Sequence, residues 1–106
     1  MNIEVLYIAD CPSHPATVEL LKSVLVAEGM RPEITEVLVA NEQMASDLSF
    51  RGSPTVRING RDIAEESPYS GRLACRLYPG SDQIGVPPIE LVRRAVRQAR
   101  HERGML

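Results

Sequence analysis

The sequence predicts a single α/β domain in which a mixed four-stranded sheet carries helices on its faces. Residues 3–9 form a nearly all apolar, β-prone run, and a helical apolar stripe and a second β-prone run follow it. This pattern is typical of two parallel strands joined by a crossover helix. Asn59-Gly60 stands between two further alternating runs, which is the strongest short signal for an antiparallel hairpin. The length of 106 residues fits one hydrophobic core, so we expect one domain over residues 1–106.

The first half of the chain predicts a strand, a helix and a parallel strand. Residues 3–9 are nearly all apolar, which favours a central strand covered on both faces. Residues 13–28 predict a helix, and Gly29 is well placed to end it. A second β-prone run covers residues 34–39. The apolar stripe of the helix consists of Val18, Leu21, Val24 and Leu25.

The second half predicts a short helix, a hairpin and a final helix. Asn41 can cap a short helix that carries Met44 and Leu48 on one side. Residues 55–58 and 61–64 form the hairpin strands on either side of the Asn-Gly turn. The order is therefore β-α-β-α-β-β-α. Pro87-Pro88 opens the last helix, and its apolar stripe consists of Ile89, Val92, Val96 and Ala99.

The segment at residues 65–86 is a long loop without clear periodicity. Segments of this length without helix or strand patterns are usually functional or mobile. We therefore expect this loop to matter for function.

The composition excludes several classes of protein. A hydrophobic content of 43%, a charged content of 25% and a formal net charge of -2 are ordinary for a soluble protein, so neither nucleic acid nor membrane is an expected partner. The first residues show no basic leader and no cleavage site, which predicts a cytoplasmic location. Five arginines follow the polar side of the last helix, and we interpret them as a solvated face rather than a phosphate-binding stripe. They are Arg93, Arg94, Arg97, Arg100 and Arg103.

Cys11 stands where the first strand gives way to the first helix. A thiol at the start of a helix faces unpaired N–H groups and the positive end of the helix dipole, and both favour the thiolate. His14 lies one helical turn further on, and an imidazolium there would favour the thiolate further. Pro15 lacks an N–H group and weakens the argument from the first turn. The alternative is a buried cysteine that acts only as a small hydrophobic residue.

Two short motifs resemble the thioredoxin superfamily. They are Cys11-Pro12-Ser13-His14 after the first strand and Ser53-Pro54-Thr55 before the hairpin. In that family a cis-proline before the third strand lies beside the cysteine motif, so Pro54 resembles its counterpart. The resemblance implies a thioredoxin-like fold and thiol chemistry at Cys11. It also implies a groove for a thiol or peptide substrate that involves Pro12, Ser53, Pro54 and Thr55.

A further block, from Ser70 to Tyr78, is similar to small thioredoxin-like proteins that are sometimes labelled alkylmercury lyase. The chain is shorter than an organomercurial lyase and lacks that enzyme's catalytic cysteine and aspartate motifs. We therefore do not expect lyase activity, and the block remains a mercury-related resemblance only.

The motif departs from the dithiol pattern of the family, because His14 stands where a second cysteine would be. Cys11 then has three options. It forms a mixed disulfide with glutathione, it pairs with Cys75 in the long loop, or it does no covalent chemistry. A bridge between Cys11 and Cys75 would close a loop of about 60 residues and favour the oxidised form by ~4 kcal/mol in an unstrained geometry. The first two options describe a thiol-disulfide oxidoreductase that needs no cofactor, with a thiol, glutathione or a protein disulfide as substrate.

Two other functions remain open. Cys11, His14 and Cys75 supply two thiolates and an imidazole, which suit a soft metal such as mercury, copper or zinc. For Hg(II), Cys11 and Cys75 alone would suffice. The other alternative is a binding module without chemistry, which presents a sheet edge or the loop at residues 65–86 to a protein partner. The sequence does not indicate an oligomeric state.

Overall fold

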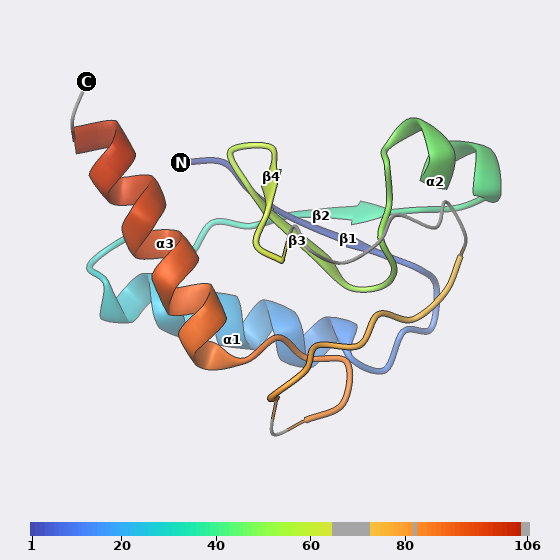
Figure 1. Cartoon of the computed structure of the whole chain (residues 1–106), viewed down its shortest axis with the longest axis horizontal. Helices are drawn as coiled ribbons and strands as arrows, with labels where there is room; N and C mark the ends of the chain where they lie inside the picture. Colours follow the sequence, from blue (N-terminus) through green and yellow to red (C-terminus); the bar gives the residue numbers. More distant parts are fainter. Residues whose placement is uncertain (65–72, 82, 105–106) are drawn as a thin grey trace.

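A computed structural model describes residues 1–64, 73–81 and 83–104 of the chain (Figure 1). The described residues contain four strands and three helices in the predicted order. These elements are β1 (Ile3–Tyr7), α1 (His14–Ala27), β2 (Thr35–Leu38), α2 (Glu42–Asp47), β3 (Thr55–Ile58), β4 (Arg61–Asp62) and α3 (Ile89–Gly104).

The four strands form one mixed sheet in the order β2-β1-β3-β4. β1 is central: it pairs in parallel with β2, opposite Glu36 at Val5, and antiparallel with β3, opposite Val56 at Val5. β4 pairs antiparallel with β3 through the hairpin. The predicted α/β architecture with a mixed four-stranded sheet is therefore confirmed, as is the central position of the first strand.

Two apolar cores cover the two faces of the sheet. Successive residues of a strand point to opposite faces, so Val5 belongs to one core and Leu6 to the other. α1 and α3 contribute to the first core and lie on one side of the sheet (Figure 1). Residues of α2 and the chain after it, including the fully buried Phe50, form the second core. Burying one such side chain completely stabilises the fold by roughly 1.5–3 kcal/mol.

The cap and turn residues that the sequence predicts lie at the ends of α1, α2 and the hairpin strands. Asn41 caps α2, because its Oδ1 accepts the N–H of Met44 at 2.8 Å. Gly29 has φ +73° directly after α1, a conformation that glycine adopts without steric cost. Asn59 and Gly60 both have positive φ at the tip of the hairpin, as a tight two-residue turn requires.

The second hairpin strand is shorter than predicted. The sequence predicts residues 61–64, whereas β4 covers Arg61–Asp62. The N–H of Ile63 still donates to the Val56 carbonyl of β3 at 3.1 Å, and the N–H of Ala64 donates to the Asp62 carboxylate at 2.8 Å. Such a side-chain bond two residues back turns the chain out of the strand.

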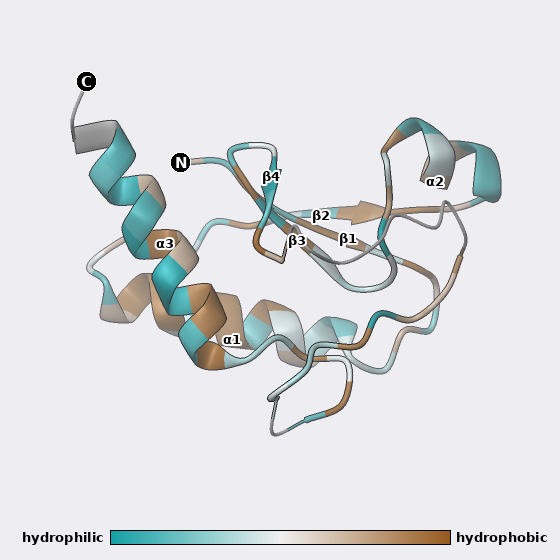
Figure 2. Cartoon of the chain, in the orientation of Figure 1, coloured by the Kyte–Doolittle hydropathy of each residue, from teal (hydrophilic) through white to brown (hydrophobic). Residues whose placement is uncertain are grey.

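The apolar stripe of α3 is confirmed except at its start. Val92, Val96 and Ala99 are buried, but Ile89 is 45% exposed, so its assignment to the core is wrong. Periodicity gives the direction of a side chain around the helix axis but not where along the axis the packing partner begins. Toward its C-terminal end α3 becomes mostly hydrophilic (Figure 2).

The predicted long loop is only partly described, since residues 65–72 and 82 lie outside the described residues. The first part of the Ser70–Tyr78 block falls in that range. Residues 73–81 are neither helix nor strand, yet Arg76 and Tyr78 are buried there. The described part of the loop therefore packs on the domain. Among the described residues, no helix combines the length and the apolar character needed to cross a membrane.

Candidate functional site

Cys11 lies in a tight turn between β1 and α1. Its N–H donates to the Ile8 carbonyl, and its own carbonyl accepts the N–H of His14, both at 3.3 Å. The residue is buried, with 7% of its surface exposed. α1 begins at His14, and its N-cap residue, Ser13, makes no capping bond with its side chain. Cys11 therefore lies two residues before the N-cap, Ser13. The N–H of His14, the first residue of α1, already donates to the Cys11 carbonyl.

The side chain of His14 contacts residues of β1 and β2. Its ring stacks on Tyr7, with centroids 3.7 Å apart and planes 3° from parallel. Its Nε2 lies 2.6 Å from the Glu36 carboxylate. These side-chain contacts of His14 are therefore with β1 and β2 rather than with Cys11. Tyr7 is half-buried, and its ring packs flat against this imidazole.

Ser53 and Pro54 lie at the end of the sheet, next to the Cys11 turn. The peptide bond between them is cis, as the resemblance implied. The N–H of Ile8 donates to the Ser53 hydroxyl at 3.1 Å. Thr55 is fully buried and bonds to the Gly52 carbonyl, and Pro54 is less than 2% exposed. Pro12 is exposed, so of the four residues expected to contact a substrate it is the one with a free surface.

Cys75 is exposed and lies on an extended segment that pairs in parallel with Ser53. The N–H of Ser53 donates to the Ala74 carbonyl at 2.8 Å, and the N–H of Arg76 donates to the Ser53 carbonyl at 2.9 Å. Ser53 thus connects the two cysteine-bearing segments: one through Ile8, the other directly. Cys11 and Cys75 are both free thiols.

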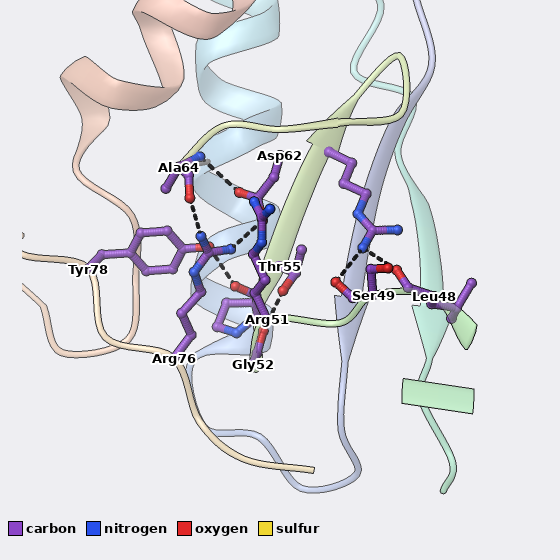
Figure 3. A network of polar contacts seen from close by, with 11 residues as sticks. Leu48, Ser49, Arg51, Gly52, Thr55, Asp62, Ala64, Arg76 and Tyr78 are labelled. Atoms are coloured by element: carbon purple, nitrogen blue, oxygen red, sulfur yellow. Dashed lines mark hydrogen bonds and ion pairs between the residues drawn. The ribbon is translucent and has the colours of Figure 1, made fainter. Parts of the chain in front are cut away.

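A buried ion pair holds the Cys75 segment against the hairpin (Figure 3). Arg76 Nη1 lies 2.9 Å from Asp62 Oδ2, and the two side chains are only 2% and 6% exposed. Arg76 Nη2 donates to the Ala64 carbonyl at 2.7 Å. Arg51 also approaches the Asp62 carboxylate, at 3.5 Å. The buried Asp62 carboxylate therefore pairs with two arginines, and Arg76, which follows Cys75, is the closer one.

Tyr78 and Gly52 complete this attachment. The Tyr78 hydroxyl donates to the Pro54 carbonyl at 2.6 Å, and burial raises the pKa of Tyr78. The guanidinium of Arg76 lies 4.9 Å from the centroid of the Tyr78 ring, within the range of a cation–π contact. A Cβ at position 52 would lie 3.0 Å from the Cβ of Arg76, so a glycine allows this close approach. Sequence reasoning missed these roles, although the glycine before Ser53 was a visible signal.

The loop before α3 covers the cysteine motif from another side. The Ser13 hydroxyl donates to the Ile84 carbonyl at 3.1 Å. A Cβ at Gly85 would lie 2.2 Å from the Ser13 hydroxyl oxygen, so only glycine fits there. The sequence shows this glycine but does not indicate which residue it faces.

The three-ligand metal set does not form among the described residues, and arginines of the α3 stripe pair with acidic residues. In the described parts of the chain, which include Cys11, His14 and Cys75, no three or more His, Cys, Asp or Glu side chains are grouped to hold a metal. Arg97 and Arg100 both pair with Glu28, which supports the interpretation of a solvated face. Hydrogen bonding to Arg97 lowers the pKa of Glu28. Arg93 pairs with Glu90 in the same helix, and the Arg103 side chain lies outside the description.

The candidate site consists of the Cys11 turn, the Ser53–Pro54 bond and the Cys75 segment. Its three parts come from residues far apart in the sequence, and Ser53 contacts two of them. Comparison of the chain with protein-family models, with curated proteins and with solved structures gave no match.

Proposed function

We propose that the protein is a thioredoxin-like thiol-disulfide oxidoreductase with Cys11 as its nucleophile. The observation that carries the proposal is the position of Ser53, which bonds to Ile8 at the base of the Cys11 turn and to the segment of Cys75. The order of the elements and the mixed sheet are compatible with the thioredoxin-like resemblance of the two motifs. We place the protein in the cytoplasm, where thiols such as these two stay reduced.

The proposed reaction is thiol–disulfide exchange. The Cys11 thiolate attacks one sulfur of a disulfide, forms a mixed disulfide with it and releases the other sulfur as a thiolate. A second thiolate, from Cys75 or from glutathione, then attacks the mixed disulfide. It either releases the substrate thiol and leaves Cys11 bridged to the attacking thiol, or it frees Cys11. In the first case the substrate disulfide is reduced and Cys11 and the attacking thiol are oxidised; in the second the substrate sulfur passes to the attacking thiol. In both cases one disulfide breaks and one forms, so no further oxidant is required.

Access to Cys11 limits the kind of substrate. With 7% of the residue exposed, a disulfide reaches its sulfur only from a narrow direction. The contact between Ser13 and the Ile84–Gly85 segment lies two residues from Cys11. A small, flexible disulfide such as oxidised glutathione fits this restriction better than a rigid protein surface, and we propose it as the first substrate to use.

The test follows the two cysteines by peptide mass spectrometry after incubation with oxidised glutathione. In the unmodified protein we expect either a Cys11–Cys75 bridge or a glutathione adduct on Cys11. Cys75→Ser should retain glutathione on Cys11, whereas Cys11→Ser should prevent bridge formation. Both variants are checked for native far-ultraviolet circular dichroism. If Cys11 stays unmodified in the folded protein while exposed Cys75 reacts, the proposal is wrong.

A further inference from the structure

The hairpin and the end of α2 border an open groove with a volume of about 700 Å³. Ligand pockets in proteins commonly enclose ~300–1,000 Å³, so the space suffices for a small molecule. We call it the arginine groove, because three of its lining side chains are arginines. The lining residues used below are Leu48, Ser49, Arg51, Arg57, Arg61 and Asp62.

The charge of the arginine groove is positive although the chain as a whole has a net charge of -2. Arg61 pairs with Glu102, so among the described lining residues Arg51 and Arg57 face the single carboxylate of Asp62. That carboxylate, on Asp62, lies nearer to the buried Arg76 than to Arg51, at 2.9 against 3.5 Å. Arg51 is thus incompletely compensated, and the groove carries a positive potential.

Arg57 adds a guanidinium that is held by carbonyl groups rather than by a carboxylate. Its Nη2 donates to the carbonyl oxygens of Leu48 and Ser49, directly after α2. These contacts orient the guanidinium without neutralising its charge. An arginine oriented by the backbone loses less conformational freedom when it binds a ligand.

The arginines of α3 provide a contrast within the same chain. Arg97 and Arg100 share Glu28, whose side chain is 12% exposed, and Arg93 pairs with Glu90. Each of these arginines has a carboxylate partner on or next to its own helix. In the described residues, the arginine groove therefore combines a cavity with Arg57, which is held by carbonyl groups, and Arg51, which shares its carboxylate with Arg76. By contrast, the three α3 arginines named above each have a carboxylate partner.

We propose that the arginine groove binds the phosphate group of a small phosphorylated molecule, with Arg51 and Arg57 as its main contacts. A phosphate monoester near neutral pH carries close to two negative charges, so it can pair with both guanidiniums. Its oxygens accept paired hydrogen bonds from guanidinium forks, whereas a single carboxylate would leave one fork without a partner. The site is independent of the proposed thiol chemistry, since it involves neither cysteine.

The test titrates inorganic phosphate into the full chain and follows backbone amide resonances by NMR. Sodium chloride at the same ionic strength serves as the reference, because unspecific attraction is screened by salt. We expect saturable shifts confined to residues 48–51 and 57–62. Arg51→Gln and Arg57→Gln should each weaken binding by about tenfold, since a hydrogen bond to a charged group is lost.

Arg31→Gln is the matched control, because Arg31 is 87% exposed and lies outside the groove. It removes the same charge and should leave phosphate binding unchanged. If Arg57→Gln disturbs α2, Arg51→Gln decides the question, because Arg51 contacts a side chain and not the backbone of α2. The proposal is overturned if phosphate binding does not saturate or if the shifts spread over other surfaces. It is also overturned if Arg31→Gln weakens phosphate binding as much as the groove variants do. None of these outcomes depends on whether Cys11 reacts.

Discussion

Replacement of Asp62 by asparagine tests the buried ion pair most directly. The substitution keeps the shape of the side chain and removes its charge, so that Arg76 keeps a full positive charge at 2% exposure. Removing one partner of a buried pair costs ~3–5 kcal/mol, because the remaining charge is desolvated without compensation. A domain of this size has a total free energy of unfolding of about 5–15 kcal/mol. Asp62→Asn should therefore remove a large share of the stability.

Urea denaturation followed by circular dichroism measures this loss as a change of midpoint at constant slope. The double variant Asp62→Leu/Arg76→Met should recover much of it, because apolar residues of similar volume replace a buried ion pair at little cost. The control is Glu102→Gln, which removes a carboxylate partner of Arg61 from a pair whose side chains are 60% and 53% exposed. Its effect should be close to zero.

The same variants report on the Cys75 segment. The N–H of Arg76 bonds to Ser53, so its hydrogen exchange should accelerate in Asp62→Asn more than exchange in β1 does. The reasoning is refuted if Asp62→Asn loses less than about 1 kcal/mol, the cost of an ordinary exposed pair. It is also refuted if the double variant is as unstable as the single one.

Three further substitutions test local features of the fold. Gly85→Ala should destabilise the protein by ~1–3 kcal/mol more than Gly80→Ala in thermal denaturation, since both glycines have φ +81° but only Gly85 has a neighbour in the way; equal losses would show that the contact with Ser13 gives way freely. The pKa of Glu28 is lowered by Arg97, so this group stabilises the fold above its ordinary pKa of 4.5 and the contribution is lost as the pH falls through the lowered value. The stability difference between the unmodified protein and Glu28→Gln should accordingly shrink on acidification, and a difference that stays constant down to low pH would contradict the assignment. Asn41→Ala should cost ~1 kcal/mol in urea denaturation through loss of the α2 cap, and Asn41→Asp should cost much less; similar losses in the two variants would mean that the cap does not matter.

The sequence by itself determined the elements and their order. The apolar run of β1, the cap at Asn41 and the Asn59-Gly60 turn each act through neighbouring residues, so pattern reasoning found them. The parallel pairing of β1 with β2 followed from the helix between them, because a crossover connection returns the chain in the same direction. The two cysteines and the motif around Pro54 could also be found in the sequence, because each is recognised from its residue types alone.

Only the tertiary structure decided how the parts of the site meet. Nothing in the sequence near Cys75 indicates that its segment pairs with Ser53, or that Asp62 holds Arg76. The exposure of Ile89 was equally out of reach. Local patterns record the preferences of a few consecutive residues, whereas these contacts join segments separated by a loop that has no periodicity of its own. Their geometry depends on how that loop closes over the sheet, and close packing rather than local preference selects it.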